Sequence, residues 1–492
     1  MQAQRLTLPK GKSIHIIICL LIMALFWVLP APAPLTQVGM RVIGVFAGTV
    51  LLFSLVDTFW PALLAVLLLS RTGVASLNDV IAGSLGNWGV YFILMSLIMC
   101  AALNRVGFLD RLVSKFMGIK FVTRGPWIFT FSMAAVGMIL GSFIDQIPAT
   151  AFILAFANRV YKELGYTYKD PYPHVANIVC VFATVIGGAM TPISHALTIL
   201  GLSLFEGVAG QQISLFSYLA FGVPTGLLCF VALIVVTLIL TKVMKIDTSN
   251  FDNFDVTKVL GQQNKMDLRE KITVALFFGT VLVWILPGIG AVVTPGAAWV
   301  AAIDSFGITF WAILCALILG VLHINGTPVI ELKEIIKEDV NWSLLIFISV
   351  CVYFGSALAN PATGLNEWIT QNLTPLTASV APMVVIFIIT AGSEIMTNFA
   401  ANSATILVMT TIATTLAMSS GGSLNPAGMA MCVTMAASLA YLLPSSFGCI
   451  AMLHGDKWSD SKKVYLFGII MMAVTCVIVS FVGYPISCIL AK

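Results

Sequence analysis

The chain has 492 residues, of which 59% are hydrophobic and only 9% are charged. Soluble domains carry roughly 25% charged residues, so this composition excludes a soluble globular protein. Together with a mean hydropathy of +1.01, it predicts an all-α polytopic membrane protein embedded in a lipid bilayer. In such a chain the formal net charge of +4 gives no indication of a nucleic-acid partner, and none is expected.

The N-terminal half begins with a basic segment and continues with seven apolar runs. Arg5, Lys10 and Lys12 precede the first run, and no small-residue cleavage site follows it. Residues 1–38 are therefore predicted to hold an extra, retained helix rather than a signal peptide. A helix needs about 20 residues to cross a bilayer, and the runs are close to that length. They are 14–30, 39–56, 58–71, 87–104, the interrupted region 125–157, 172–202 and 216–242.

The second half repeats this order after a polar linker, 243–270, which we expect in the cytoplasm. Asn87-Trp88 opens one run and Asn341-Trp342 opens its counterpart. We therefore predict two repeats, 39–242 and 271–492, with about 11 transmembrane helices in total. The apolar runs of the second half are 271–288, 304–322, 341–359, the interrupted region 380–417, 425–453 and 464–490.

The distribution of Lys and Arg predicts that the two repeats have opposite orientations. Basic residues gather in cytoplasmic loops. Segments 105–124 and 158–170 are basic, whereas their counterparts 360–379 and 414–427 contain no Lys or Arg. In the other loop pairs the bias reverses, because 323–340 and 454–463 are basic while 72–86 and 203–215 are not. This inverted topology places the N-terminus in the cytoplasm and the C-terminus outside, in the inner (cytoplasmic) membrane of a cell.

Each interrupted region contains a polar stretch, Gly141–Thr150 in one and Gly392–Thr405 in the other. Unsatisfied polar groups cost roughly several kcal/mol in hydrocarbon, so these stretches must pack within protein or line a wet cavity. Region 125–157 is flanked by basic residues on both sides, which predicts a re-entrant hairpin from the cytoplasm that turns at Ser142–Pro148. Region 380–417 is predicted to be a hairpin from outside that turns at Thr397–Ser403.

Two further breaks are expected opposite these hairpin tips, Gly187–His195 within 172–202 and Pro444–Gly448 within 425–453. Proline and glycine interrupt helical hydrogen bonding and free backbone carbonyls, which are good sodium ligands. Paired broken segments in two halves indicate the binding site of a secondary transporter with alternating access.

The motifs at the second tip resemble those of a known family. Thr397-Asn-Phe-Ala-Ala-Asn-Ser-Ala-Thr405, with Asn425-Pro426 and Ala437–Pro444, is similar to the divalent anion:sodium symporter family of the ion transporter superfamily. The family's Ser-Asn-Thr at each tip is nearly matched by Ala401-Asn402-Ser403, whereas Asp145-Gln146-Ile147 departs from it. Its Thr-Pro-Pro-Asn after each break is replaced by Ser194-His195-Ala196-Leu197 and Ser446-Phe447-Gly448-Cys449.

The resemblance implies an elevator-type homodimer that carries a di- or tricarboxylate or sulfate, by symport or exchange, with sodium as the coupling ion and no other cofactor. Substrate-binding residues would be Gln146, His195, Asn402, Ser403 and Gly448. Ion-binding residues would be Ser142, Asp145, Ser194, Thr397, Asn402 and Ser446. The departures at the first tip leave the transported anion and the coupling ion open.

Asp145 is the most informative single residue, because an ionisable side chain within the membrane indicates a functional site. It fits a sodium ligand, which we favour, or a proton carrier; a buried structural carboxyl is the remaining interpretation. His195 would suit an anionic substrate when protonated, and is equally consistent with a packed polar residue. The alternative functions that follow from Asp145 are a proton-coupled anion transporter and a sodium/proton or other inorganic-ion antiporter.

Other classes of protein lack the motifs that they require. The sequence has no His-Glu-x-x-His motif or nucleophile–base pair that would indicate an enzyme, and no Gly-x-x-x-x-Gly-Lys loop for an ATP-driven pump. The ten cysteines are scattered and form no Cys-x-x-Cys pair, so no transition-metal site is expected.

Overall fold

The structure of the protein is a computed structural model that describes residues 11–119, 122–248, 265–372 and 379–490, and the single positions 251 and 375. Within these residues the regular secondary structure is helical except for one short antiparallel hairpin, β1 (His323–Ile324) and β2 (Thr327–Pro328). Arg5, Lys10 and most of the predicted linker 243–270 lie outside the described residues.

The helices of the first half follow the predicted runs. They are α1 (Ser13–Val28), α2 (Gln37–Leu55), α3 (Phe59–Thr72), α4 (Leu77–Leu85), α5 (Trp88–Arg105), α6 (Phe108–Met117), η1 (Val122–Arg124), α7 (Pro126–Phe143), α8 (Gln146–Glu163), α9 (Pro171–Met190), α10 (Ala196–Ala209) and α11 (Leu215–Met244).

The helices of the second half show the same order of a long helix, a short helix, a hairpin and a broken helix. They are α12 (Leu268–Val293), α13 (Ala298–Asp304), α14 (Gly307–Val321), α15 (Leu332–Glu338), α16 (Trp342–Ala359), η4 (Pro361–Thr363), α17 (Leu365–Asn372), α19 (Pro382–Phe399), α20 (Asn402–Met418), α21 (Pro426–Ala436), α22 (Gly448–Gly455), α23 (Ser461–Ile478), η5 (Val479–Gly483) and α24 (Tyr484–Leu490).

The prediction of an all-α polytopic membrane protein is confirmed. In the described residues nine helices are long and apolar enough to cross a membrane, or ten if α13 and α14, bent by 67°, form one span. The predicted number of about 11 agrees only approximately, because runs such as 14–30 and 58–71 form apolar helices shorter than a full span.

Two segments differ from the sequence prediction. The expected loop 72–86 contains helix α4, which begins with a capping box in which the side chains of Ser76 and Asp79 each bind the other residue's backbone N–H. The second break is also longer than Pro444–Gly448, because α21 ends at Ala436 and the chain stays non-helical until Phe447.

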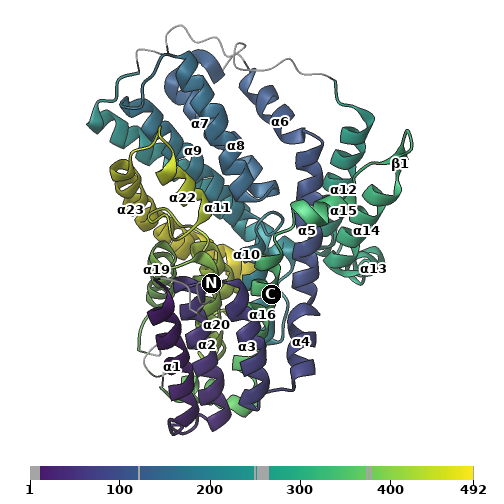
Figure 1. Ribbon diagram of the computed structural model, residues 1–492, viewed down its shortest axis with the longest axis vertical. Helices are drawn as coiled ribbons and strands as arrows, with labels where there is room; N and C mark the ends of the chain where they lie inside the picture. The colour runs from purple at the N-terminus through teal and green to yellow at the C-terminus, as the bar shows by residue number, and fades with distance from the viewer. Residues whose placement is uncertain are drawn as a thin grey trace, which may run out of the picture.

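Both interrupted regions form helical hairpins that turn inside the predicted stretches. Helices α7 and α8 pack together and meet at Ile144–Asp145, and α19 and α20 pack together and meet at Ala400–Ala401. Figure 1 shows α7 and α8 toward one end of the long axis and α19 and α20 toward the other, with α10 between them. The sides of the membrane from which they enter remain a prediction.

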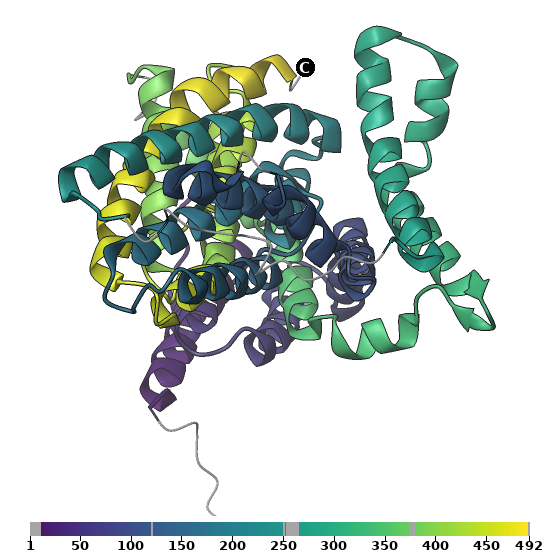
Figure 2. The ribbon, with the colours of Figure 1, turned by 90° about the horizontal axis from the view of Figure 1, so that it is seen from above.

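Helices α12 to α15 form an arm beside the main bundle (Figure 2). Helices α12 and α14 both contact α5, and α12 also contacts α11. Arg111 of α6 binds the buried carboxylate of Glu270 through two nitrogens, with N–O distances of 2.5 and 2.7 Å. This pair fixes the start of the arm to the first half of the chain.

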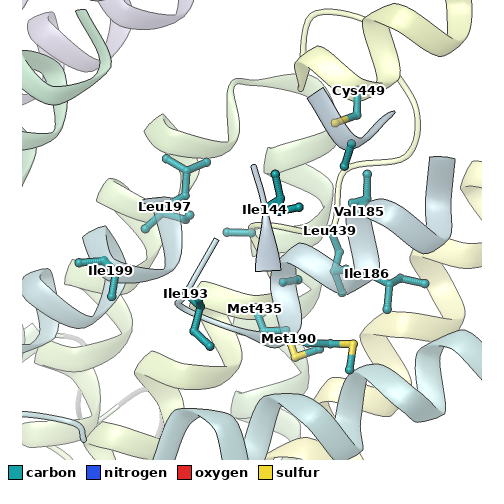
Figure 3. Packing of buried hydrophobic residues seen from close by; sticks show 14 of the residues in the cluster. Ile144, Val185, Ile186, Met190, Ile193, Leu197, Ile199, Met435, Leu439 and Cys449 are labelled. Carbon is teal, nitrogen blue, oxygen red and sulfur yellow. The ribbon is translucent and has the colours of Figure 1, made fainter. Parts of the chain in front are cut away.

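The hairpin tips are supported by a continuous apolar core. Ile144 at the first tip belongs to the same buried cluster as Val185 of α9, Leu439 of the second break and Cys449 of α22. Figure 3 shows these side chains around the first tip, with Met190 and Met435 below them. The core therefore holds the first tip against elements from both halves of the chain.

Candidate functional site

The two hairpin tips and the two breaks enclose a cavity of about 330 Å³. Six of the residues predicted to bind substrate or ions line it: Asp145, His195, Asn402, Ser403, Ser446 and Gly448. The opposite wall comes from Thr58, which precedes α3, and from Asn341 and Ser343 at the start of α16. The cavity thus lies between the hairpin elements on one side and the starts of α3 and α16 on the other.

The first tip is fastened to the first break by three hydroxyl groups. Ser142 Oγ donates to the carbonyl oxygen of Gly187 at 3.0 Å, and Ser194 Oγ donates to that of Gly141 at 2.6 Å. Thr191 Oγ1 donates to the carbonyl oxygen of Ser142 at 2.5 Å. Ser142 and Ser194 are both buried outside the large cavity, where hydroxyl and carbonyl oxygens come together.

A space of about 10 Å³ lies beside this junction and is lined by Asp145, Pro192 and Ser194 among others. This volume is close to the roughly 10–15 Å³ that one water molecule requires. Asp145 lines both this space and the large cavity, so its carboxylate lies at the boundary between them.

Gln146 points away from the large cavity, although the sequence predicts it as a substrate ligand. Its Nε2 donates to the carbonyl oxygen of Val185 at 3.2 Å. Its side chain lies directly over Gly188, where an added Cβ would come within 1.4 Å of Nε2. Gln146 therefore packs the first tip onto α9 at a place where only glycine fits.

The second tip is joined to the second break through Thr397 and Asn402. Thr397 Oγ1 donates to the side-chain oxygen of Asn402 at 2.9 Å and also contacts the carbonyl oxygen of Ala437. The Asn402 backbone N–H donates to the carbonyl oxygen of Ser446 at 3.4 Å, and Nδ2 donates to that of Ser438 at 3.5 Å. Three of the predicted ion ligands, Thr397, Asn402 and Ser446, are thus brought together.

Asn398 is a structural member of the site that the sequence analysis missed. Its Oδ1 accepts hydrogen bonds from the backbone N–H groups of Tyr441 and Leu442, at 2.7 and 2.9 Å. Its Nδ2 donates to the carbonyl oxygen of Glu394 at 2.7 Å. Its position in the polar stretch Gly392–Thr405 indicated a role in the site. Only the fold shows that its side chain hydrogen-bonds the non-helical backbone of the second break.

Three helix N-termini face the cavity without a side-chain cap. They belong to α10, α20 and α22, whose N-cap residues are His195, Ala401 and Phe447. A helix N-terminus carries roughly half a positive charge and presents unpaired N–H groups, so it attracts anions. Helix α8 differs, because the Asp145 carboxylate caps it by accepting from the Ile147 N–H at 2.9 Å.

His195 is the second titratable side chain that lines the cavity. It is only 5% exposed, and its Nε2 has no hydrogen-bond partner in the described part of the chain. The Phe447 ring lies edge-on to the imidazole with centroids 6.1 Å apart. A buried, unpaired ring nitrogen at a cavity wall is available to a bound ligand.

Comparisons with known proteins give one consistent result. The family model described as "Sodium:sulfate symporter transmembrane region" matches residues 10–490. The chain is 23% identical over 486 residues to the sodium-dependent dicarboxylate transporter SdcS of Staphylococcus saprophyticus, covering 96% of this chain and 91% of that protein. The crystal structure of the Alcanivorax borkumensis YdaH transporter is similar with a TM-score of 0.57 and 12% identity, covering 98% of each chain, and this likeness concerns the fold alone.

Proposed function

Because the chain belongs to the sodium:sulfate symporter family, which is a family of membrane transporters and not of enzymes, we propose that it is a sodium-coupled secondary transporter of a small dicarboxylate or similar anion. The dicarboxylate named for the Staphylococcus relative supports this substrate class. Sodium and the anion are the proposed partners, in the cytoplasmic membrane of a cell.

The observation that carries the proposal is the convergence of three uncapped helix N-termini on one cavity. Carboxylate oxygens can accept hydrogen bonds from unpaired N–H groups in the first turns of these helices, with further donors from the side chains of Asn402 and Ser403. No Lys or Arg lines the cavity among the residues that the structure describes. Helix N-termini and polar side chains therefore supply the attraction for the anion, together with any bound cation.

Sodium is proposed to bind at the two junctions between tip and break. At the second junction the ligands are the oxygens of Thr397, Asn402 and Ser446 with the nearby backbone carbonyls. At the first junction they are Ser142 and Ser194, beside the small space that Asp145 also lines. Sodium near the cavity would offset the charge of the entering anion.

Transport is proposed to follow an elevator-type alternating-access mechanism in a homodimer. The hairpins and broken helices, which are joined by the hydrogen bonds described above, would move as one body. Helices in 39–104 and 271–359 would form the static scaffold that includes the wall of Asn341 and Ser343.

Counterflow in proteoliposomes tests the proposed substrate class. Proteoliposomes loaded with unlabelled succinate, with equal sodium concentrations on both sides, should take up labelled succinate transiently. Liposomes without the protein should not. An excess of a small dianion, such as malate, should block this uptake, whereas acetate should not. Absence of labelled uptake with succinate, citrate and sulfate, combined with sodium/proton exchange, would instead support an inorganic-ion antiporter.

A further inference from the structure

The cavity wall is electrically asymmetric, and Asp145 is the reason. Asp145 is the only side chain with a formal charge that lines the cavity in the described part of the chain, and its charge is negative. A site that binds only a dianion gains nothing from a fixed carboxylate, since like charges in a poorly solvated site repel strongly. Asp145 is therefore matched by a cation or a proton when the site is occupied.

One carboxylate oxygen of Asp145 is free to meet a cation in the large cavity. The other oxygen, Oδ1, caps helix α8 through the Ile147 N–H, and no hydrogen bond to Oδ2 is found in the described residues. The carboxylate is partly exposed to the large cavity, so Oδ2 can meet a ligand there. The N-terminus of α8 is thus already occupied by an anion that belongs to the protein.

The other three helix N-termini make the rest of the wall electropositive. The α20 and α22 N-termini come from the second half of the chain, and the α10 N-terminus adds the unpaired Nε2 of the buried His195. A ligand that matches this wall carries carboxylate oxygens toward α10, α20 and α22 and a cationic group toward Asp145. A cavity of about 330 Å³ is near the lower end of ligand pockets, roughly 300–1,000 Å³, and favours a small molecule.

We propose that the substrate is an amino dicarboxylate, such as aspartate or glutamate, whose ammonium group binds Asp145. This inference rests on the proposed function and specifies its substrate class. The ammonium group can donate hydrogen bonds to Asp145 Oδ2, and such charge-assisted bonds are roughly twice as strong as neutral ones. Succinate has the same carbon skeleton as aspartate without the ammonium group, so it leaves the Asp145 charge unmatched.

Competition against uptake of labelled succinate tests the inference in the wild-type protein. Aspartate should inhibit uptake at a concentration about tenfold or more below that of unlabelled succinate, because it alone forms a charge-assisted hydrogen bond with Asp145. N-acetylaspartate, which keeps both carboxylates and lacks the ammonium group, should lose this advantage. Aspartate that competes no better than succinate would overturn the inference while leaving the proposed function in place. Failure of every dicarboxylate to enter would contradict the proposed function itself.

Two variants of Asp145 distinguish binding of a substrate ammonium group from binding of sodium or a proton at this carboxylate. Asp145→Asn keeps the side-chain oxygen that caps α8, and Asp145→Ser keeps a hydroxyl there. In both variants the ratio of aspartate to succinate affinity should shift toward succinate by about tenfold or more, and sodium dependence should be retained. If the ratio of aspartate to succinate affinity is unchanged and sodium dependence is lost, Asp145 is a sodium ligand. If the ratio is unchanged and only the pH dependence of uptake disappears, Asp145 carries a proton; either result overturns the inference.

Discussion

Thr397 and Asn402 lie on opposite sides of the second hairpin tip, and the Thr397 hydroxyl donates to the Asn402 side-chain oxygen at 2.9 Å. Both side chains are buried, and both also contact the non-helical backbone of the second break. The tip and the break therefore share one set of oxygen atoms, so a cation bound there would join them.

Asn402→Ala should abolish sodium-driven uptake, with a loss of about 100-fold or more, while the protein remains folded. The change removes a proposed ligand of both sodium and anion and leaves buried polar groups unpaired at roughly 1–3 kcal/mol each. Thr411→Val is the matched control, because its buried hydroxyl only donates to the Leu407 carbonyl within α20. Initial uptake rates in proteoliposomes measure both variants, and a wild-type rate for Asn402→Ala would remove the second tip from the site.

Asn398→Ala should lower the thermal stability of the purified protein. It leaves the buried backbone N–H groups of Tyr441 and Leu442 without their acceptor, at a cost of about 2–6 kcal/mol for the two. Asn398→Asp retains an acceptor for both groups and should be less destabilised than the alanine variant. The order of stability is measured by heating the detergent-purified proteins and following the loss of monodisperse protein. Equal stability of Asn398→Ala and wild type would show that the second break does not depend on this side chain.

The first tip makes a different prediction, based on packing. Gly188→Ala should displace Gln146 and destabilise the protein by about 1–3 kcal/mol, and the second change Gln146→Ala should recover much of this loss. The stability lost in Gly187→Ala should not be recovered by Gln146→Ala, because the new Cβ at position 187 would meet the backbone oxygen of Met138 at 2.0 Å. Gly279→Ala, which has open space around it, is the control and should be neutral. If Gln146→Ala fails to restore Gly188→Ala, the contact between these two residues is not the cause.

The sequence predicted both hairpin turns and most of the cavity wall, because glycine, proline and polar residues interrupt long apolar runs in few other ways. It missed Asn398 and misplaced Gln146, since the direction in which a side chain points at a helix break depends on the packing of neighbouring helices. The start of the second break at Ala437 was also missed. Residues 437–443 are largely apolar and contain no proline or glycine, so their non-helical backbone depends on tertiary hydrogen bonds such as those to Asn398.

The opposite orientation of the two repeats is tested by labelling single cysteines. A cysteine in place of Lys162, which is exposed in the last turn of α8, should react with a membrane-impermeant reagent only from the cytoplasmic side. A cysteine in place of Ser423 should react only from outside; this exposed position is preferred to Gly421, whose φ of +65° disfavours a side chain. Most native cysteines are buried, which keeps the background low. Reaction of both positions from the same side would rule out inverted repeats.

Coupling of the anion to sodium is the central claim, and accumulation of labelled dicarboxylate against its concentration gradient tests it most directly. Proteoliposomes with an inward sodium gradient and equal pH on both sides should concentrate labelled succinate or aspartate above the external level. A sodium ionophore should abolish this accumulation, and a protonophore should leave it largely intact. Accumulation that persists without a sodium gradient and requires a pH gradient would contradict sodium coupling and assign the driving force to protons.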